Sequence, residues 1–398
     1  MSAGGRERLK DRLAVVGVGY TPQGKVPGRT ALSFHLEACV NAIADAGLRK
    51  EDIDGLLLYR HLEPLGEDLD VTGFLVAQHL GIRPAVLSQE AYCYRSWLTH
   101  ALGLLETGVC RYVLVCYGDN GRSQRRSFVG ELHCGAPADD GAAFGDFSVM
   151  AKYALCARRA MYEDGTGPHV WKRIAASQRR WACLNPRAAM YGKPLSEEDY
   201  LSAEYLVEPF RILDATMITD GGRAIVLTTA ERAKELGRPY ATVSGFGVSN
   251  TAMLPLWQTH TDRTSGAFPA GRDAFEMAGI TRAEIGACEI YDCFTYTVEA
   301  TLRDYGFFEP KDSAEWFVPE RIGPGGSLPV NTSGGLLSES YCMGLTPVSE
   351  AVMQLTGRCG ERQLGVLPGT KRPEFILCSD NGEVYQSHLA LILKEGGR

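Results

Sequence analysis

Short apolar runs alternate with amphipathic helical patterns along this chain, and the same alternation occurs twice. In the first half, runs of strand length are interleaved with segments of helical apolar spacing, such as 32–47, which Gly47 should end. The strand candidates of this half are 13–19, 55–60, 85–89, 112–117 and 224–229. Alternation of this kind predicts an α/β fold with a mostly parallel sheet that helices cover on both faces.

The second half of the chain repeats this plan. Its strand candidates are 240–248, 288–292, 374–380 and 387–393, and helical patterns lie between them at 268–280, 294–307 and 347–357. The similarity lies in the order of the elements rather than in a short repeat, so it predicts an internally duplicated fold. We divide the chain into residues 1–235 and 236–398. Charged helical patterns at about 120–215 predict a helical cap inserted into the first half.

Composition narrows the class of function. The 398 residues are 45% hydrophobic and 22% charged, which is typical of a globular enzyme and far from a disordered chain. A formal net charge of −7 argues against a nucleic-acid-binding protein. Basic clusters at 122–126 and 179–180 could still bind the phosphate of a nucleotide, or could be solvated helix faces.

Targeting and cofactor signals are missing from the sequence. It has no run of about eighteen uncharged apolar residues and no signal peptide, so we expect no membrane span and a cytoplasmic location. The twelve cysteines form no CxxC pair, and we expect reduced thiols and no metal site. The segment GVGYTPQG (17–24) resembles a dinucleotide fingerprint, but Pro22 replaces its third glycine. We therefore expect no nicotinamide or flavin cofactor.

Several segments, in the same order, resemble the thiolase superfamily. They are AVVGVGYTP (14–22), 190–214, 220–229, 290–307, 328–344 and 349–357. The similarity covers almost the whole chain and points to the lipid-transfer-protein branch, which includes sterol carrier thiolases and steroid side-chain aldolases. The resemblance implies a five-layered αβαβα sandwich of two similar halves, with the active site between them.

The chain departs from a condensing thiolase at the position of the nucleophile. The family's nucleophile lies at the start of the helix that corresponds to the helical pattern 96–108, which Gly108 ends. Counting back from Gly108 by the family's usual helix length places the nucleophile position at Ala91, and alanine cannot form an acyl-enzyme. Cys93 is an alternative nucleophile, although its neighbours in 92–95 are bulky where thiolases use small residues. Cys378, in LCSDNG, matches the family's second catalytic cysteine, and could be a proton carrier or a relic of the ancestral site.

Two tyrosines match the other catalytic positions of the family. Tyr341, in NTSGGLLSESYCMG, corresponds to the family's catalytic histidine, and Tyr291, in YDCF, corresponds to its asparagine or histidine. Steroid side-chain aldolases are similar in carrying a tyrosine at both positions and in lacking the nucleophilic cysteine. We interpret Tyr296 as a packing residue, and we expect Asp292 to hydrogen-bond the backbone at the start of the helix that follows it.

These residues favour an aldol-lyase that cleaves a β-hydroxyacyl-CoA thioester and releases acetyl-CoA or propionyl-CoA with a ketone or an aldehyde. Retro-aldol cleavage needs a base for the hydroxyl proton, hydrogen-bond donors for the enolate oxygen and an acid for the carbanion. A phenol can donate while neutral, and can act as a base if its neighbours lower its pKa. Two alternatives stay open: an acyltransferase that uses Cys93 or Cys378, and a non-catalytic acyl-CoA-binding or lipid-binding subunit.

The resemblance also implies partners. It implies a homodimer that associates with a small OB-fold, zinc-ribbon protein that binds acyl-CoA. Coenzyme A then enters only as part of the substrate, and no separate cofactor is expected. The bulky stretch 92–95 differs from the glycine-rich loop of the steroid enzymes, so the acyl group remains open.

Overall fold

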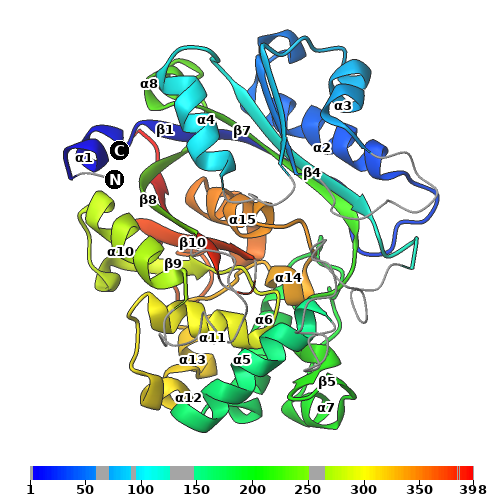
Figure 1. Ribbon diagram of the computed structural model, residues 1–398, viewed down its shortest axis with the longest axis vertical. Coiled ribbons are helices and arrows are strands. Elements are labelled where there is room, and N and C mark those ends of the chain that lie inside the picture. The colour runs from blue at the N-terminus through cyan, green and yellow to red at the C-terminus, as the bar shows by residue number, and fades with distance from the viewer. Residues whose placement is uncertain are drawn as a thin grey trace, which may run out of the picture.

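The computed structural model describes residues 3–59, 71–90, 96–125, 148–250 and 265–397, apart from 383 and 385 (Figure 1). Most strands of this part of the chain belong to one sheet. They are β1 (Leu13–Tyr20), β2 (Gly55–Tyr59), β3 (Val86–Glu90), β4 (Val113–Asn120), β7 (Asp220–Thr229), β8 (Ala241–Asn250), β9 (Ile285–Glu289), β10 (Phe375–Gly382) and β11 (Ser387–Glu395). Their order across the sheet is β3-β2-β4-β7-β1-β8-β11-β10-β9.

The strand order shows the internal duplication. The first half contributes β2-β4-β7-β1, and the second half contributes the same series as β9-β10-β11-β8. In each series the first pair is parallel and the next two pairs are antiparallel. The halves join where β1 pairs with β8, through Ala14 with Thr242 and Val15 with Ala241. The expected architecture of two similar halves is confirmed.

The prediction of a mostly parallel sheet was wrong. Among the described strand pairs, only β2 with β3, β2 with β4, and β9 with β10 are parallel. The last two strands show one physical reason, because the four residues 383–386 that join β10 to β11 are too few for a parallel crossover. Apolar runs alone give no strand direction.

The helices complete the five layers. The main helices are α2 (Ala31–Ala46), α3 (Gly73–Leu80), α4 (Trp97–Glu106), α10 (Ala267–Ala278), α11 (Thr295–Asp304) and α15 (Leu345–Leu355). Helices α2 and α3 cover the outer face of the first half, α10 and α11 cover that of the second, and α4 and α15 fill the space between (Figure 1). Three apolar cores, one on each outer side and one around α4 and α15, separate the layers. Within the described residues, no helix is both long and apolar enough to cross a membrane.

The inserted cap packs on the second half, although it interrupts the first half in sequence. It contains α5 (Val149–Asp164), α6 (Pro168–Cys183), α7 (Glu197–Ser202), β5 (Tyr205–Val207) and β6 (Phe210–Arg211). Figure 1 shows α5 and α6 beside α11 and the short helix α12 (Ser313–Trp316). The buried carboxylate of Glu299, on α11, accepts hydrogen bonds from Trp171 Nε1 at 2.7 Å and from Thr166 Oγ1 at 2.5 Å.

Glycines allow the closest contacts between strand and helix. A Cβ on Gly19, in β1, would lie 1.9 Å from the carbonyl oxygen of Ala38 on α2. The second half repeats this contact, since a Cβ on Gly247, in β8, would lie 2.0 Å from the carbonyl oxygen of Ala270 on α10. Packing therefore explains the glycines of the GVG segment that resembled a dinucleotide fingerprint.

We predict that Gly19→Ala destabilises the protein. The added methyl group has no space, so the free energy of unfolding should fall by about 1–3 kcal/mol, which urea denaturation would measure. Gly103→Ala in α4 is the matched control, because a Cβ there meets no atom within 4 Å. The control should be neutral or stabilising by up to about 1 kcal/mol. Equal losses in both variants would contradict the close-packing explanation.

Candidate active site

The structure brings Tyr291 and Tyr341 together. Their hydroxyl oxygens lie 3.1 Å apart, and their rings form a T-shaped contact with centroids 6.5 Å apart. Either hydroxyl can be the donor of the hydrogen bond between them. Tyr291 is buried and Tyr341 is partly exposed. Two positions that are fifty residues apart in sequence therefore form one pair of phenols.

Tyr291 lies just beyond the end of β9. The strand spans Ile285–Glu289 rather than the predicted 288–292, so Tyr291 belongs to the segment that leaves the sheet. Its backbone N–H donates to Ser379 Oγ at 3.0 Å, and its carbonyl oxygen accepts from Asn381 Nδ2 at 3.3 Å. Both partners lie on β10, the parallel neighbour of β9, which fixes the position of the phenol.

The paired glycines before Tyr341 start a short helix, α14 (Gly335–Ser338). Gly334 and Gly335 have φ values of 105° and 62°, which side chains rarely adopt. The carboxylate of Asp292 accepts hydrogen bonds from the N–H groups of Leu336 at 2.8 Å and Leu337 at 3.0 Å. We expected Asp292 to bind the start of the helix that follows it, α11. It binds the start of α14 instead, and so connects the segments that carry the two tyrosines.

The first half of the chain holds the other side of the Tyr341 turn. Glu339 forms a fully buried ion pair with Arg223 of β7, at 2.5 Å. The backbone N–H of Tyr341 donates to Thr219 Oγ1 at 3.0 Å. Because one partner of each contact lies at or beside β7 and the other on the turn, the site lies where the halves meet.

The surroundings of both phenols favour the neutral form. Burial raises the pKa of Tyr291 well above its usual value, and the negative charge of Asp380 contributes. Burial also raises the pKa of Tyr341, with contributions from Cys293, Asp380 and Asp119. A phenolic base would need the opposite shift. In this geometry the two phenols are therefore hydrogen-bond donors at neutral pH.

Two more tyrosines, both from the first half, extend the pair into a chain of four rings. Tyr117 of β4 makes a T-shaped contact with Tyr341, with ring centroids 6.4 Å apart. Tyr59, at the end of β2, makes the same type of contact with Tyr117 at 6.3 Å. The four rings thus form one series of contacts from the end of β2 in the first half to the segment after β9 in the second half. Sequence reasoning did not single out Tyr59 or Tyr117.

Two buried aspartates accept hydrogen bonds from these added tyrosines. Tyr117 donates to Asp119 Oδ2 at 3.2 Å, and Tyr59 donates to Asp380 Oδ2 at 3.4 Å. The aspartates lie on equivalent strands, β4 and β10, and each begins an Asp-Asn-Gly sequence. This repeat was the signal in the sequence that could have identified them.

Cys378 lies deeper in the protein than the tyrosine pair. Its side chain is fully buried in the apolar core around α15, where Sγ is 3.9 Å from the carbonyl oxygen of Pro347. Burial raises the pKa of its thiol well above the usual value. Among the described contacts, none joins Cys378 to Tyr291 or Tyr341. Ala91 and Cys93 lie outside the described residues.

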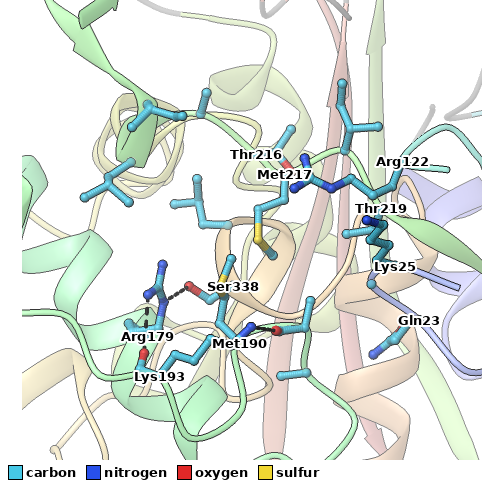
Figure 2. A pocket seen from close by; sticks show the side chains of 18 of the residues that line it. Gln23, Lys25, Arg122, Arg179, Met190, Lys193, Thr216, Met217, Thr219 and Ser338 are labelled. Carbon is cyan, nitrogen blue, oxygen red and sulfur yellow. Dashed lines mark hydrogen bonds between the residues drawn. The ribbon is translucent and has the colours of Figure 1, made fainter. Parts of the chain in front are cut away.

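A cavity of about 860 Å³ lies beside the Tyr341 turn (Figure 2). Thr219 lines it and also accepts the hydrogen bond from the Tyr341 backbone, although neither tyrosine of the pair lines it. Five cationic side chains line this cavity: Lys25, Arg122, Arg179, Arg187 and Lys193. Its described lining contains no aspartate or glutamate. Arg122 and Arg179 come from the two basic clusters noted in the sequence.

Arg179 is the buried cation of this cavity. Its guanidinium donates to Ser338 Oγ at 3.1 Å and to the carbonyl oxygen of Lys193 at 3.3 Å (Figure 2). Both acceptors are neutral, no carboxylate pairs with Arg179 within the described part of the chain, and burial lowers its pKa. Burying a charge without a counter-charge is unfavourable, so this cavity is suited to an anionic ligand.

Comparisons with known proteins agree on one family. The family "Thiolase C-terminal domain-like" matches residues 249–395. The chain is 31% identical to the 17-hydroxy-3-oxo-4-pregnene-20-carboxyl-CoA lyase of Mycobacterium tuberculosis, over 88% of this chain and 92% of the relative. It is 30% identical to the steroid side-chain-cleaving aldolase of Thermomonospora curvata, over 88% of this chain and 91% of that relative.

A solved structure is similar over nearly the whole chain. It is the structure of the "Ltp2-ChsH2(DUF35) aldolase", and it superposes with a TM-score of 0.84 at 28% sequence identity. The match covers 98% of this chain and 99% of the other. The five-layered arrangement described above is therefore shared with an aldolase.

We predict that Tyr291 and Tyr341 remain protonated at neutral and moderately alkaline pH. A raised pKa keeps an acid neutral up to a higher pH, so neither phenol should ionise below about pH 10. The ultraviolet phenolate absorbance of the wild type, minus that of the double variant Tyr291→Phe/Tyr341→Phe, should stay flat from about pH 7 to pH 10. A phenolate signal near pH 7 in this difference would show that one of them is a poised base.

Proposed function

The chain belongs to the thiolase superfamily, in the branch of the sterol carrier thiolases, and from this we propose that it is an aldol-lyase acting on a β-hydroxyacyl-CoA thioester. The products are acetyl-CoA or propionyl-CoA and a ketone or an aldehyde. One observation carries the proposal: the hydroxyl oxygens of Tyr291 and Tyr341, which the resemblance matches to the family's catalytic positions, lie 3.1 Å apart. The relatives at 31% and 30% identity are named as a lyase and an aldolase.

In this mechanism the phenols stabilise the charge that develops on the substrate. When the bond between Cα and Cβ breaks, its electron pair moves toward the thioester carbonyl and forms an enolate. Tyr291 and Tyr341 are held as neutral donors, and such donors stabilise an enolate oxygen most strongly where water is excluded. One phenol then supplies a proton to Cα. No acyl-enzyme is needed.

The state of Cys378 disfavours the acyltransferase alternative. A cysteine acts as a nucleophile through its thiolate, and reactive cysteines are partly exposed with a lowered pKa. The thiol of Cys378 is fully buried with a raised pKa. We therefore assign it no covalent step. The binding-subunit alternative differs from the aldolase in needing no phenol, and the tyrosine variants below distinguish the two.

We propose that the cationic cavity receives the phosphate-bearing end of coenzyme A. Coenzyme A carries several phosphate charges, and the cavity offers five cations without a described acid. The cavity reaches Thr219, which holds the Tyr341 turn, so the thioester end of the same molecule would extend toward the phenols. Coenzyme A then serves as part of the substrate and not as a separate cofactor.

We further propose that the chain works as a homodimer with a small OB-fold, zinc-ribbon protein. The related aldolase of known structure is named together with a DUF35 protein. Strand β3 is an edge strand that pairs only with β2 among the described strands, and such an edge can accept a strand from a second copy. The activity assays below therefore use the whole chain together with a purified DUF35 protein.

We predict that Tyr291→Phe and Tyr341→Phe each lower turnover by about 10²-fold or more, because each removes a donor to the enolate or an acid. The substrate is the thioester that gives the tuberculosis relative its name, with smaller β-hydroxyacyl-CoA thioesters beside it. Release of acetyl-CoA or propionyl-CoA is measured. The losses in the double variant should not add, because both groups serve one transition state.

The control for these variants is Tyr296→Phe. Tyr296 lies on α11 and packs on Trp171, with ring centroids 6.0 Å apart, away from the pair. It should keep turnover near that of the wild type. If both pair variants cleave at wild-type rates while they bind acyl-CoA normally, the aldolase mechanism is wrong and the chain is better described as a binding subunit.

We predict that Arg179→Gln weakens acyl-CoA binding without lowering the stability of the free protein. The cation has no described carboxylate partner, so its removal leaves no opposite charge unpaired. Loss of a charged hydrogen bond to phosphate should raise the dissociation constant roughly tenfold or more. Titration calorimetry with coenzyme A and thermal unfolding measure the two effects. Lys234→Gln, on the exposed helix α8 (Ala230–Glu235), should change neither quantity.

A further inference from the structure

The reaction proposed above needs a group that accepts the proton of the substrate hydroxyl. Burial and nearby negative charge raise the pKa of Tyr291 and of Tyr341, which disfavours either phenol as a base. The acceptor must therefore be a different side chain at the same place. The inference that follows rests on the proposed aldolase function.

Asp380 is a buried carboxylate beside the tyrosine pair. It lies on β10, between Ser379 and Asn381, the two residues that hold the backbone of Tyr291. Because successive side chains of a strand point to opposite faces, Asp380 points away from these two, toward the central layer. There its Oδ2 accepts a hydrogen bond from Tyr59.

The chain leaves space for this carboxylate at the start of α15. A Cβ on Gly344, the residue before the helix, would lie 2.2 Å from Asp380 Oδ2. Gly344 lies three residues after Tyr341, so the turn that presents the phenol also accommodates the carboxylate. The positive end of the helix dipole favours an ionised group at this position.

The structure also separates Asp380 from the two other candidates for a base. Asp119 is the equivalent residue of the first half, and besides burial its charge is among the causes that raise the pKa of Tyr341, whereas the charge of Asp380 contributes to the raised pKa of both phenols. Cys378 lies two residues before Asp380 on the same strand and the same face, where its Sγ contacts the carbonyl oxygen of Pro347 in the apolar core. Of the two aspartates, Asp380 is the one whose neighbours in sequence, Ser379 and Asn381, bind the backbone of Tyr291.

We propose that Asp380 accepts the hydroxyl proton in the cleavage step, with Tyr59 as the positioning residue that orients its carboxylate. The O–H bond of the substrate breaks as the proton moves to Asp380, and the oxygen electrons form the carbonyl group of the released ketone or aldehyde. The Cα–Cβ electron pair moves into the thioester enolate. A phenol of the pair protonates Cα, and the proton on Asp380 restores that phenol.

The test compares Asp380→Asn with Asp119→Asn in the full chain with its DUF35 partner. Asp380→Asn keeps the shape and the acceptor oxygen for Tyr59 but cannot take a proton. Its turnover should fall by about 10²–10⁴-fold with little change in KM. Asp119→Asn is the matched control, and its turnover should fall clearly less than that of Asp380→Asn. Turnover of Asp380→Asn within tenfold of the wild type would overturn the proposal.

Chemical rescue provides a readout that a structural role would not change. Asp380→Ala leaves a space of carboxylate size, and added formate should restore cleavage in proportion to its concentration, whereas Tyr341→Phe should not respond. Loss of activity in Asp380→Ala without a response to formate would assign Asp380 to holding the site together, and would overturn its role as acceptor. A wild-type protein that cleaves none of the thioesters would instead refute the proposed function itself.

Tyr59→Phe keeps the proposal testable if the Asp380 variants do not fold. It removes one hydroxyl from the hydrogen bond to Asp380 and little volume. Turnover should fall while KM and the thermal midpoint stay close to those of the wild type. Unchanged turnover in Tyr59→Phe, with the Asp380 variants unfolded, would count against Asp380 as the acceptor.

Discussion

The carboxylate of Asp292 joins the two segments that build the site, and the geometry around the phenols depends on it. It follows Tyr291 directly, and it binds the N–H groups of the helix that leads to Tyr341. Gly335 is necessary because a Cβ there would lie 2.3 Å from the same carboxylate. Burial raises the pKa of Asp292 to about 8, while its backbone hydrogen bonds oppose that shift. These hydrogen bonds thus link the segments of two side chains that are fifty residues apart in sequence.

The duplicated fold explains why the site lies between the halves. Equivalent strands, β4 and β10, carry the same Asp-Asn-Gly sequence near their ends, and Tyr59 at the end of β2 reaches across to Asp380 of β10. The first half contributes Tyr59 and Tyr117, and the second half contributes Tyr291 and Tyr341. The buried pair of Arg223 and Glu339 crosses the same boundary. Neither half alone contains the complete set of side chains.

The sequence predicted local elements well and long-range relations poorly. The helix expected at 32–47 spans Ala31–Ala46, and Gly47 ends it with a φ of 72°, because both signals are local. The prediction of mostly parallel strands was wrong, because the pattern of apolar residues does not encode the direction of a strand. The tyrosine pair was identified only through family motifs, since neither residue differs locally from the other tyrosines of the chain. Asp380 was not singled out, because the hydrogen bond that places it beside Tyr59 joins residues 321 positions apart, which only the three-dimensional structure shows.

The position of the cap has a consequence for how the protein is made. Trp171, in the cap, donates to Glu299, which lies 128 residues later in the chain. A ribosome releases the cap before the helices on which it packs. The apolar face of the cap, which includes Trp171, is therefore exposed until those helices are made, although Trp171 is fully buried in the finished fold. Contacts of such long sequence separation also slow folding. Chaperones that bind exposed apolar segments would therefore be needed most during the synthesis of the second half.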